Sequence, residues 1–165
     1  MKTFPSSFFV LSVLLLGLIG CSYNQAGGPQ FTAAAVSNPS HALIYIYRPA
    51  DKQGGYNKSY QVTSNGVRLP NIQFNGYYSH EINPGHVHLA ASPRIENGGL
   101  AILDQAIDAA TAKPAQLDLD VRPGQVYYVK FHREMTFWGP HAPELLLISN
   151  DEGQREIRGC KLIQK

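Results

Sequence analysis

Short apolar runs, many of them alternating with polar residues, follow one another along the chain from Ala42 and are separated by turn residues. The first run, residues 42–48, is rich in β-branched and aromatic residues and stops at Pro49. Further strands are expected at residues 60–64, 67–69, 77–82, 86–90, 117–121, 126–132, 144–149 and 156–163. About seven to nine short strands predict an all-β fold, a single β-sandwich of the immunoglobulin or transthyretin kind.

The Pro84-Gly85 turn allows the register of its two flanking strands to be tested against their apolar faces. A two-residue loop there pairs Ile82 with Val87, which keeps apolar residues on one face. The same register places Glu81 opposite His88. We therefore expect a hairpin between strands 77–82 and 86–90.

Two further turns are expected to close hairpins. Asn65-Gly66 is a strong signal for a two-residue hairpin turn. A longer loop at Pro123-Gly124 pairs Leu119 with Val129 on the core side. This register leaves the aspartates at positions 118 and 120 in water.

Two segments depart from the β pattern. Apolar residues recur at helical spacing from residue 99 to Pro114 in an alanine-rich stretch, and they predict a short inserted helix near residues 99–112. In the last expected strand, the alternation slips at Gly159. A bulge at that glycine would put Ile157, Cys160 and Leu162 on the core side, so we expect Cys160 to be buried.

The N-terminus is similar to the signal peptide of a bacterial lipoprotein. Lys2 precedes an apolar run over residues 8–19, and Leu18-Ile19-Gly20-Cys21 resembles the lipobox at which a peptidase cleaves before a lipidated cysteine. As a helix, the run would span roughly 18 Å, less than the roughly 30 Å of a bilayer core. We therefore expect residues 1–20 to be removed and Cys21 to carry the lipid.

A flexible tether is expected at residues 21–41, ahead of a sandwich domain at residues 42–165. The tether sequence shows neither strand nor helix periodicity. Ser22 stands where an Asp retains many such lipoproteins in the inner membrane of enterobacteria. The resemblance therefore implies an anchor in the outer membrane, on its periplasmic side, rather than in the inner membrane.

Charge and cysteine content narrow the class of protein. The 14 Lys and Arg residues nearly balance the 12 Asp and Glu residues, so no nucleic-acid partner is expected. About 145 residues after cleavage suffice for one domain. With Cys21 consumed by its lipid, Cys160 is solitary and no intramolecular disulfide is expected.

Five short motifs of strand and turn residues follow one another along the domain. They are Tyr45-Ile46-Tyr47-Arg48-Pro49, Asn65-Gly66, Asn75-Gly76-Tyr77-Tyr78, Pro84-Gly85-His86 and Gly124-Gln125-Val126-Tyr127-Tyr128-Val129. In this order they resemble a family of uncharacterised bacterial lipoproteins with a domain of unknown function, over roughly residues 42–162 and with residues 95–113 as an insertion. The resemblance implies a small lipid-anchored sandwich. The family has no agreed activity, so no functional residue follows from it.

One candidate site is for a metal ion. In the expected hairpin, His86 and His88 point outward and Glu81 lies opposite His88. Neutral imidazoles and a carboxylate are ordinary zinc ligands. The alternative is a simple surface ion pair between Glu81 and His88. His80 falls on the inward face, where we expect a hydrogen-bonded core histidine.

A second candidate site, for a ligand or protein partner, consists of aromatic residues and one arginine. Trp138 lies on a loop punctuated by Gly and Pro, and Tyr47 and Tyr78 lie on expected strands. Arg48, at a strand end, could recognise an anion or simply pair with a carboxylate of the protein itself. The alternative for the tyrosines is packing within the sheets, and for Trp138 it is packing over the end of the sandwich.

Catalytic motifs are absent from the sequence. The chain lacks Gly-x-Ser-x-Gly, His-Glu-x-x-His and phosphate-binding glycine loops. We therefore expect no enzyme activity and no cofactor, and a structural or interaction role in the cell envelope. The alternatives are a binding module for cell-wall glycan or peptide, with peptidoglycan or an envelope protein as partner, and a metal-dependent activity through His86, His88 and Glu81.

Overall fold

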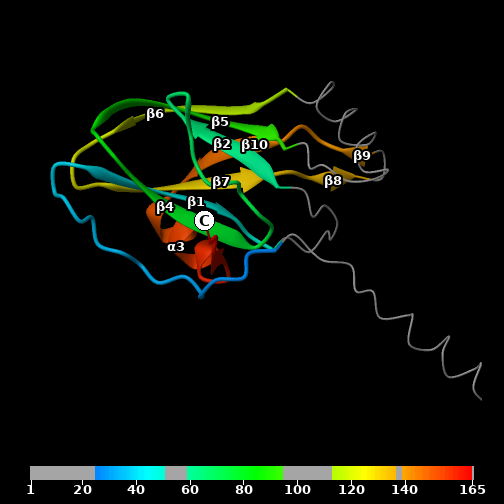
Figure 1. The fold of residues 1–165 in the computed structure, drawn as a ribbon, viewed down its shortest axis with the longest axis horizontal. Coiled ribbons are helices and arrows are strands. Elements are labelled where there is room, and N and C mark those ends of the chain that lie inside the picture. The colour runs from blue at the N-terminus through cyan, green and yellow to red at the C-terminus, as the bar shows by residue number, and fades with distance from the viewer. Residues whose placement is uncertain (1–24, 51–58, 95–112, 137–138, 165) are drawn as a thin grey trace, which may run out of the picture.

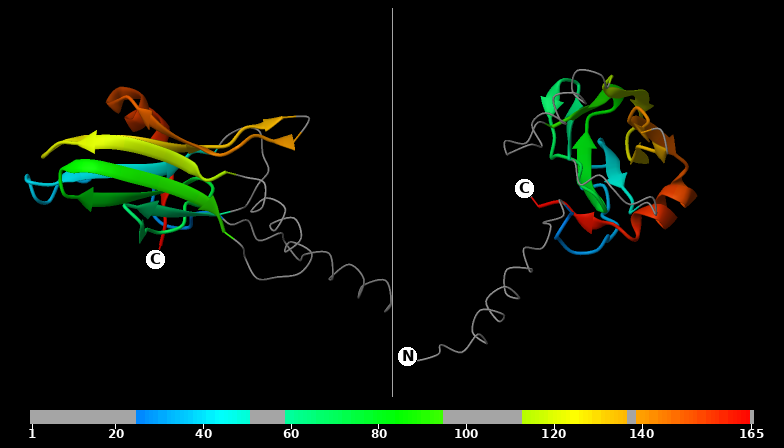
Figure 2. Two further views of the ribbon diagram at one scale, coloured as in Figure 1. Left: turned by 90° about the horizontal axis from the view of Figure 1, so that it is seen from above. Right: turned by 90° about the vertical axis from the view of Figure 1, so that its right-hand side faces the viewer.

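The computed structural model describes residues 25–50, 59–94, 113–136 and 139–164, which form a β-sandwich (Figure 1). Its five-stranded sheet has the order β10-β7-β1-β4-β11, and its four-stranded sheet has the order β3-β2-β5-β6. The two sheets lie as layers, and a small β8-β9 ribbon extends from one end (Figure 2). The elements are β1 (Ala42–Arg48), β2 (Tyr60–Ser64), β3 (Val67–Arg68), β4 (Gly76–Ile82), β5 (Gly85–Pro93), β6 (Ala115–Val121), β7 (Val126–His132), β8 (Met135–Thr136), β9 (Gly139–Pro140), β10 (Glu144–Ile148), α3 (Asn150–Ile157) and β11 (Lys161–Leu162).

The predicted all-β sandwich is confirmed, and so is its first hairpin. Strands β1, β2 and β7 have the predicted bounds. Ser64 pairs with Val67, and the turn residues Asn65 and Gly66 have φ of 49° and 79°. Both angles lie in the left-handed region that a tight hairpin turn requires.

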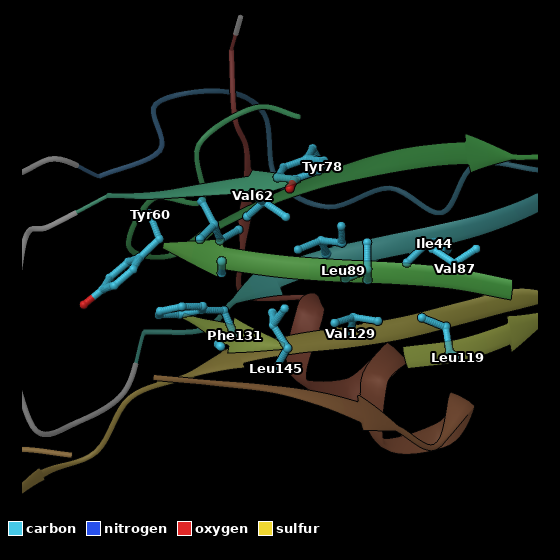
Figure 3. Close-up of a cluster of buried hydrophobic side chains, with 14 of the residues drawn as sticks. Ile44, Tyr60, Val62, Tyr78, Val87, Leu89, Leu119, Val129, Phe131 and Leu145 are labelled. Carbon is cyan, nitrogen blue, oxygen red and sulfur yellow. The ribbon is translucent and has the colours of Figure 1, made fainter. Parts of the chain in front are cut away.

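Strand β1 is buried on both faces, which explains its continuous apolar sequence. Ile44 and Ile46 point between the sheets, where they join the main core. Tyr45 and Tyr47 point to the opposite face and pack in a second cluster with Ile157 of α3. Figure 3 shows the main core, in which side chains from the two sheets meet. The five-stranded sheet is therefore the middle layer, covered on its outer face by α3 and by the N-terminal segment.

The hairpins predicted at Pro84-Gly85 and Pro123-Gly124 are wrong. At each turn the chain passes from one sheet to the other: β4 pairs with β1, β5 pairs with β2 and β6, and β7 pairs with β1 and β10. Ile82 and Val87 still face the core, as predicted, but from opposite sheets. Alternation fixes which face of a strand is buried and leaves its neighbours open, because a hairpin and a crossover bury the same residues.

The predicted last strand, 156–163, is also wrong at its start. Helix α3 occupies Asn150–Ile157, and only Lys161–Leu162 forms a strand, parallel to β4. The helix lies so close to the sheet that a Cβ added to Gly153 would overlap the Tyr128 side chain. Cys160 is fully buried, as predicted, although a turn after the helix buries it rather than a bulge. Burial raises the pKa of its thiol to about 12.

The predicted tether, residues 21–41, is too long. From Gln25 onward the chain packs on the sandwich, with backbone bridges from Gln25 to Phe74 and from Gln30 to Lys161. The Phe31 ring lies edge-on to Tyr45 and Tyr77, with ring centroids 5.2 and 5.1 Å apart. The two bridges and the aromatic contacts provide the ordering that periodicity alone could not predict.

Some predictions lie outside the described residues. These are Cys21 with the signal peptide, the helix near residues 99–112, and Trp138. Within the described ranges, no helix is long and apolar enough to cross a membrane.

Candidate functional site

The three predicted metal ligands do not come together. Glu81 lies on β4, where its carboxylate accepts hydrogen bonds from the Ser37 hydroxyl and from the Asn38 backbone N–H at 3.0 Å. His86 and His88 lie on β5, in the other sheet. The Pro84-Gly85 crossover separates them, so the geometry that suggested the site is wrong. In the part of the chain that the structure describes, no group of three or more His, Cys, Asp or Glu side chains is arranged to hold a metal ion.

His86 and His88 instead pair with the aspartates of β6. His88 Nδ1 lies 2.8 Å from Asp118 Oδ1, and His86 Nδ1 lies 3.2 Å from Asp120 Oδ1. The hydrogen bond with His88 lowers the pKa of the Asp118 carboxyl. The side chains of His86, Asp118 and Asp120 are largely exposed, and that of His88 is half-buried. We call this set of four the His–Asp ladder.

Two of the predicted contact residues, Tyr47 and Arg48, are buried structural residues. The Tyr47 hydroxyl donates to Glu156 at 2.8 Å, and Lys130 donates to the same carboxylate at 2.7 Å. Burial alone would raise the pKa of Glu156, but these two hydrogen bonds outweigh it and the net shift is downward. The Arg48 guanidinium lies 5.5 to 5.7 Å from three aromatic ring centroids, among them Tyr60. Neither residue presents a surface to a partner.

The third predicted contact residue, Tyr78, lines an open cavity of about 990 Å³. The cavity lies at the edge of the sandwich where β3 and β4 approach each other. Its walls come from the β3–β4 connection, from β4, from Arg94 after β5, and from residues 162–164 at the C-terminus. A cavity of this size can enclose most of a small organic ligand. We take this cavity, called the β4 cavity, as the candidate functional site.

Two of the residues that line the β4 cavity each carry a buried polar atom that has no partner among the described residues. Tyr78 and His80 lie two residues apart on β4, opposite Ile46 and Ile44 of β1, so both side chains face the space between the sheets. Figure 3 shows Tyr78 at the margin of the core cluster. Among the described residues, neither the Tyr78 hydroxyl nor His80 Nε2 has a hydrogen-bond partner. A buried polar group without a partner is costly and therefore rare.

Burial keeps both of these groups neutral. It raises the pKa of the Tyr78 phenol and lowers the pKa of the His80 imidazole. The inward orientation predicted for His80 is correct, but the predicted hydrogen bond is absent among the described residues. The charge of the cavity comes from Arg68 and Arg94, because no Asp or Glu is among the described residues that line it.

The β3–β4 connection that forms one wall is firmly held. Ile72 and Tyr60 exchange two backbone hydrogen bonds, at 2.8 and 3.1 Å, and the Gln61 side chain donates to the Leu69 carbonyl at 2.9 Å. In another wall, Ile163 packs so closely on Gly76 that any side chain at position 76 would push the Ile163 side chain away. The cavity is therefore preformed.

Tyr78 was predicted as a contact residue, but the β4 cavity itself was not predictable. Arg68 lies on β3 and Arg94 directly follows β5, two strands of one sheet, whereas Tyr78 and His80 lie on β4 in the other sheet. No local motif links them, and the two connections that pass between the sheets, before and after β4, bring them together here. The one available signal was the inward-facing His80.

Comparison with known proteins gives a family but no activity. No curated protein matches the chain. A family model described as a protein of unknown function, DUF2846, matches residues 38–141. The match begins just before β1 and ends before α3. Because it covers more than half of the sequence, the chain belongs to the DUF2846 family of uncharacterised proteins.

Proposed function

We propose that this protein is a lipid-anchored, noncatalytic protein of the bacterial cell envelope, whose sandwich acts as an interaction module on the periplasmic side of a membrane. The outer membrane is favoured over the inner. The lipobox-like stretch ending at Cys21 supports the anchor. Two or three acyl chains on this cysteine would hold the protein essentially permanently.

The packing of residues 25–31 carries the proposal. Only three residues separate Cys21 from Gln25, and the four steps along the chain between them reach at most roughly 14 Å. Gly28 N–H donates to the Leu162 carbonyl at 3.2 Å, and Phe31 N–H donates to the Cys160 carbonyl at 3.0 Å. In Figure 2 the N-terminal segment runs beside the C-terminal strand β11. A lipid on Cys21 would therefore hold the sandwich close to the membrane rather than at the end of a long tether.

The anchor is tested by replacing Cys21 with Ser. We expect the native protein to incorporate labelled palmitate and to fractionate with the outer membrane, and the Cys21→Ser variant to do neither. Cys160→Ala is the matched control, because it removes the other cysteine from a buried position and should keep both properties. Palmitate labelling that survives in Cys21→Ser would end the proposal.

A second candidate function is a binding module for cell-wall glycan or peptide. The preformed β4 cavity, with its two unpartnered polar groups, favours it. A peptidoglycan pull-down tests it, with Arg94→Gln at the cavity and Arg122→Gln, an exposed residue elsewhere, as the matched pair. Retention of the native chain that Arg94→Gln alone abolishes would support this function. Equal retention of both variants would contradict it.

A further inference from the structure

We propose that the β4 cavity binds the phosphate group of an organic phosphate ester. The proposal extends the proposed function, and it rests on the lipid anchor only for the source of the ligand. The same chemistry is offered by a phospholipid headgroup and by a soluble phosphate ester, and the experiment below separates the two sources.

The charge of the β4 cavity favours an anion. Arg68 and Arg94 both line it and both are exposed to solvent. Neither guanidinium has an ion-pair partner among the residues that the structure describes, and no described lining residue is acidic. Guanidinium groups bind phosphate oxygens through paired, charge-assisted hydrogen bonds. Two unneutralised arginines on one cavity therefore make an anion the best complement.

The hydrogen-bonding groups favour phosphate over a carboxylate. A neutral Tyr78 hydroxyl donates one hydrogen bond, and a neutral His80 ring with its proton on Nε2 donates another. Together with the two arginines they offer donors to several oxygens at once. A phosphate group presents three or four oxygens, whereas a carboxylate presents two. A phosphate would therefore supply partners to two groups that have none among the residues that the structure describes.

The remaining wall of the β4 cavity indicates an ester rather than inorganic phosphate. Leu69, Pro70, Leu162 and Ile163 contribute apolar surface next to the charged rim. A cavity of about 990 Å³ is far larger than one phosphate ion and leaves room for an organic substituent. We expect this substituent to pack on the four apolar residues.

The position of the β4 cavity places a membrane surface within reach. Gln25 bridges to Phe74 in the β3–β4 connection, and Leu162 N–H donates to the Pro29 carbonyl at 2.8 Å. The chain segment that leads from Cys21 thus packs on two of the walls of the cavity. An anchored protein would hold these walls close to the phosphate layer of its own membrane.

The test uses the processed chain purified in nonionic detergent and titrated with sn-glycerol 3-phosphate by calorimetry. We expect binding that weakens about tenfold or more in Arg68→Gln or Arg94→Gln, and that weakens also in Tyr78→Phe. Arg122→Gln, outside the cavity, should bind like the native chain. Because both lining arginines are exposed, their variants should melt at the native temperature.

Further arms identify the ligand and its source. Glycerate, a carboxylate of similar size, should bind at least tenfold more weakly. In nanodiscs that contain phosphatidylglycerol, binding of glycerol 3-phosphate should weaken if the lipid headgroup enters the cavity. Unchanged binding would indicate a soluble ester as the ligand. Either result supports a phosphate site. No binding, equal binding of glycerate, or binding that ignores the arginine variants would overturn the proposal. Failure of the anchor is seen separately, in the Cys21 labelling, and does not affect the detergent titration.

Discussion

Two histidine-bearing regions of the sandwich differ in how their polar groups are satisfied. On the outer face of the four-stranded sheet, His86 and His88 lie in water and pair with Asp118 and Asp120. Between the sheets, His80 is sheltered, uncharged and without a partner at Nε2 among the described residues. The first region has the more suggestive sequence, because two histidines alternate on one strand.

The comparison shows that the sequence spacing of histidines and carboxylates is a weaker sign of a binding site than a buried polar group without a hydrogen-bond partner. The His–Asp ladder already satisfies its own hydrogen bonds, and its exposure makes each pair worth little. The Tyr78 hydroxyl and His80 Nε2, which have no partner in the described part of the chain, reduce the stability of the fold unless another group forms hydrogen bonds with them. A group retained at such a cost is a better candidate for binding than one paired on the surface.

The largest expected difference between the two regions is in packing. Tyr78→Ala removes a ring that is 4% exposed and leaves a cavity, so we expect the free energy of unfolding to fall by about 3–5 kcal/mol. His86→Ala, on the surface, should change it by about 0.5 kcal/mol or less. Urea unfolding of the two variants measures both values. Equal losses would show that the two regions do not differ in this way.

A second difference is in the pH dependence of stability. Because burial lowers the pKa of His80 in the folded state, the unfolded chain binds its proton first as the pH falls below about 6.5. The contribution of His80 to stability is therefore complete above that pH and is lost below it, by at most roughly 1.4 kcal/mol per pH unit for one proton. His80→Leu should flatten the unfolding free energy between pH 6.5 and 5.

His86→Leu provides the control for this pH dependence, since it replaces an exposed histidine in the same way. It should keep the native slope over the same interval. If His80→Leu keeps the slope and His86→Leu loses it, the two regions have been assigned the wrong roles.

A smaller effect is expected from single hydroxyl groups. Tyr78→Phe removes a buried hydroxyl that has no partner within the described ranges, so we expect the free energy of unfolding to rise by about 1 kcal/mol. Tyr45→Phe is the matched control, because the Tyr45 hydroxyl accepts a hydrogen bond from Ala34 N–H at 2.7 Å. Its removal should lower the free energy by about 1 kcal/mol. Thermal unfolding would contradict the account if both variants shifted stability in the same direction.

The smallest effect concerns the His–Asp ladder alone. The hydrogen bond with His88 lowers the pKa of Asp118, so His88→Ala should move that pKa back toward its ordinary value. Carbon-detected NMR titration of the side-chain carboxyl measures the change. The titration of His80 should be unaffected by the same substitution.

Much of the fold could be predicted from alternation and turn chemistry. The run from Ala42 to Arg48 and the Asn65-Gly66 turn lead directly to β1 and to the β2–β3 hairpin. Residues 150–157 were predicted as part of a loop and a strand, because an eight-residue helix with one strongly buried apolar side chain, Ile157, has little periodicity to detect. Its position depends on close contact with Tyr128, which only the folded sheet provides.

The candidate site could be predicted only in part, for a related reason. The inward direction of His80 follows from the alternation of β4. That His80 Nε2 has no partner among the described residues does not follow from alternation, because it depends on which side chains the folded sheets place around the ring. The two arginines come from β3 and from the residue after β5, and their positions beside β4 depend on both connections that pass between the sheets, β3–β4 and Pro84-Gly85.

The central claim, that the β4 cavity is the ligand site, is tested most directly by ¹⁵N NMR of the histidine side chains during titration with sn-glycerol 3-phosphate. The imidazole nitrogens report whether each ring nitrogen carries a proton and a hydrogen bond. We predict that the Nε2 signal of His80 shifts as ligand is added while the signals of His86 and His88 stay in place. Shifts confined to His86 and His88, or no shift at His80 at saturating ligand, would contradict the account.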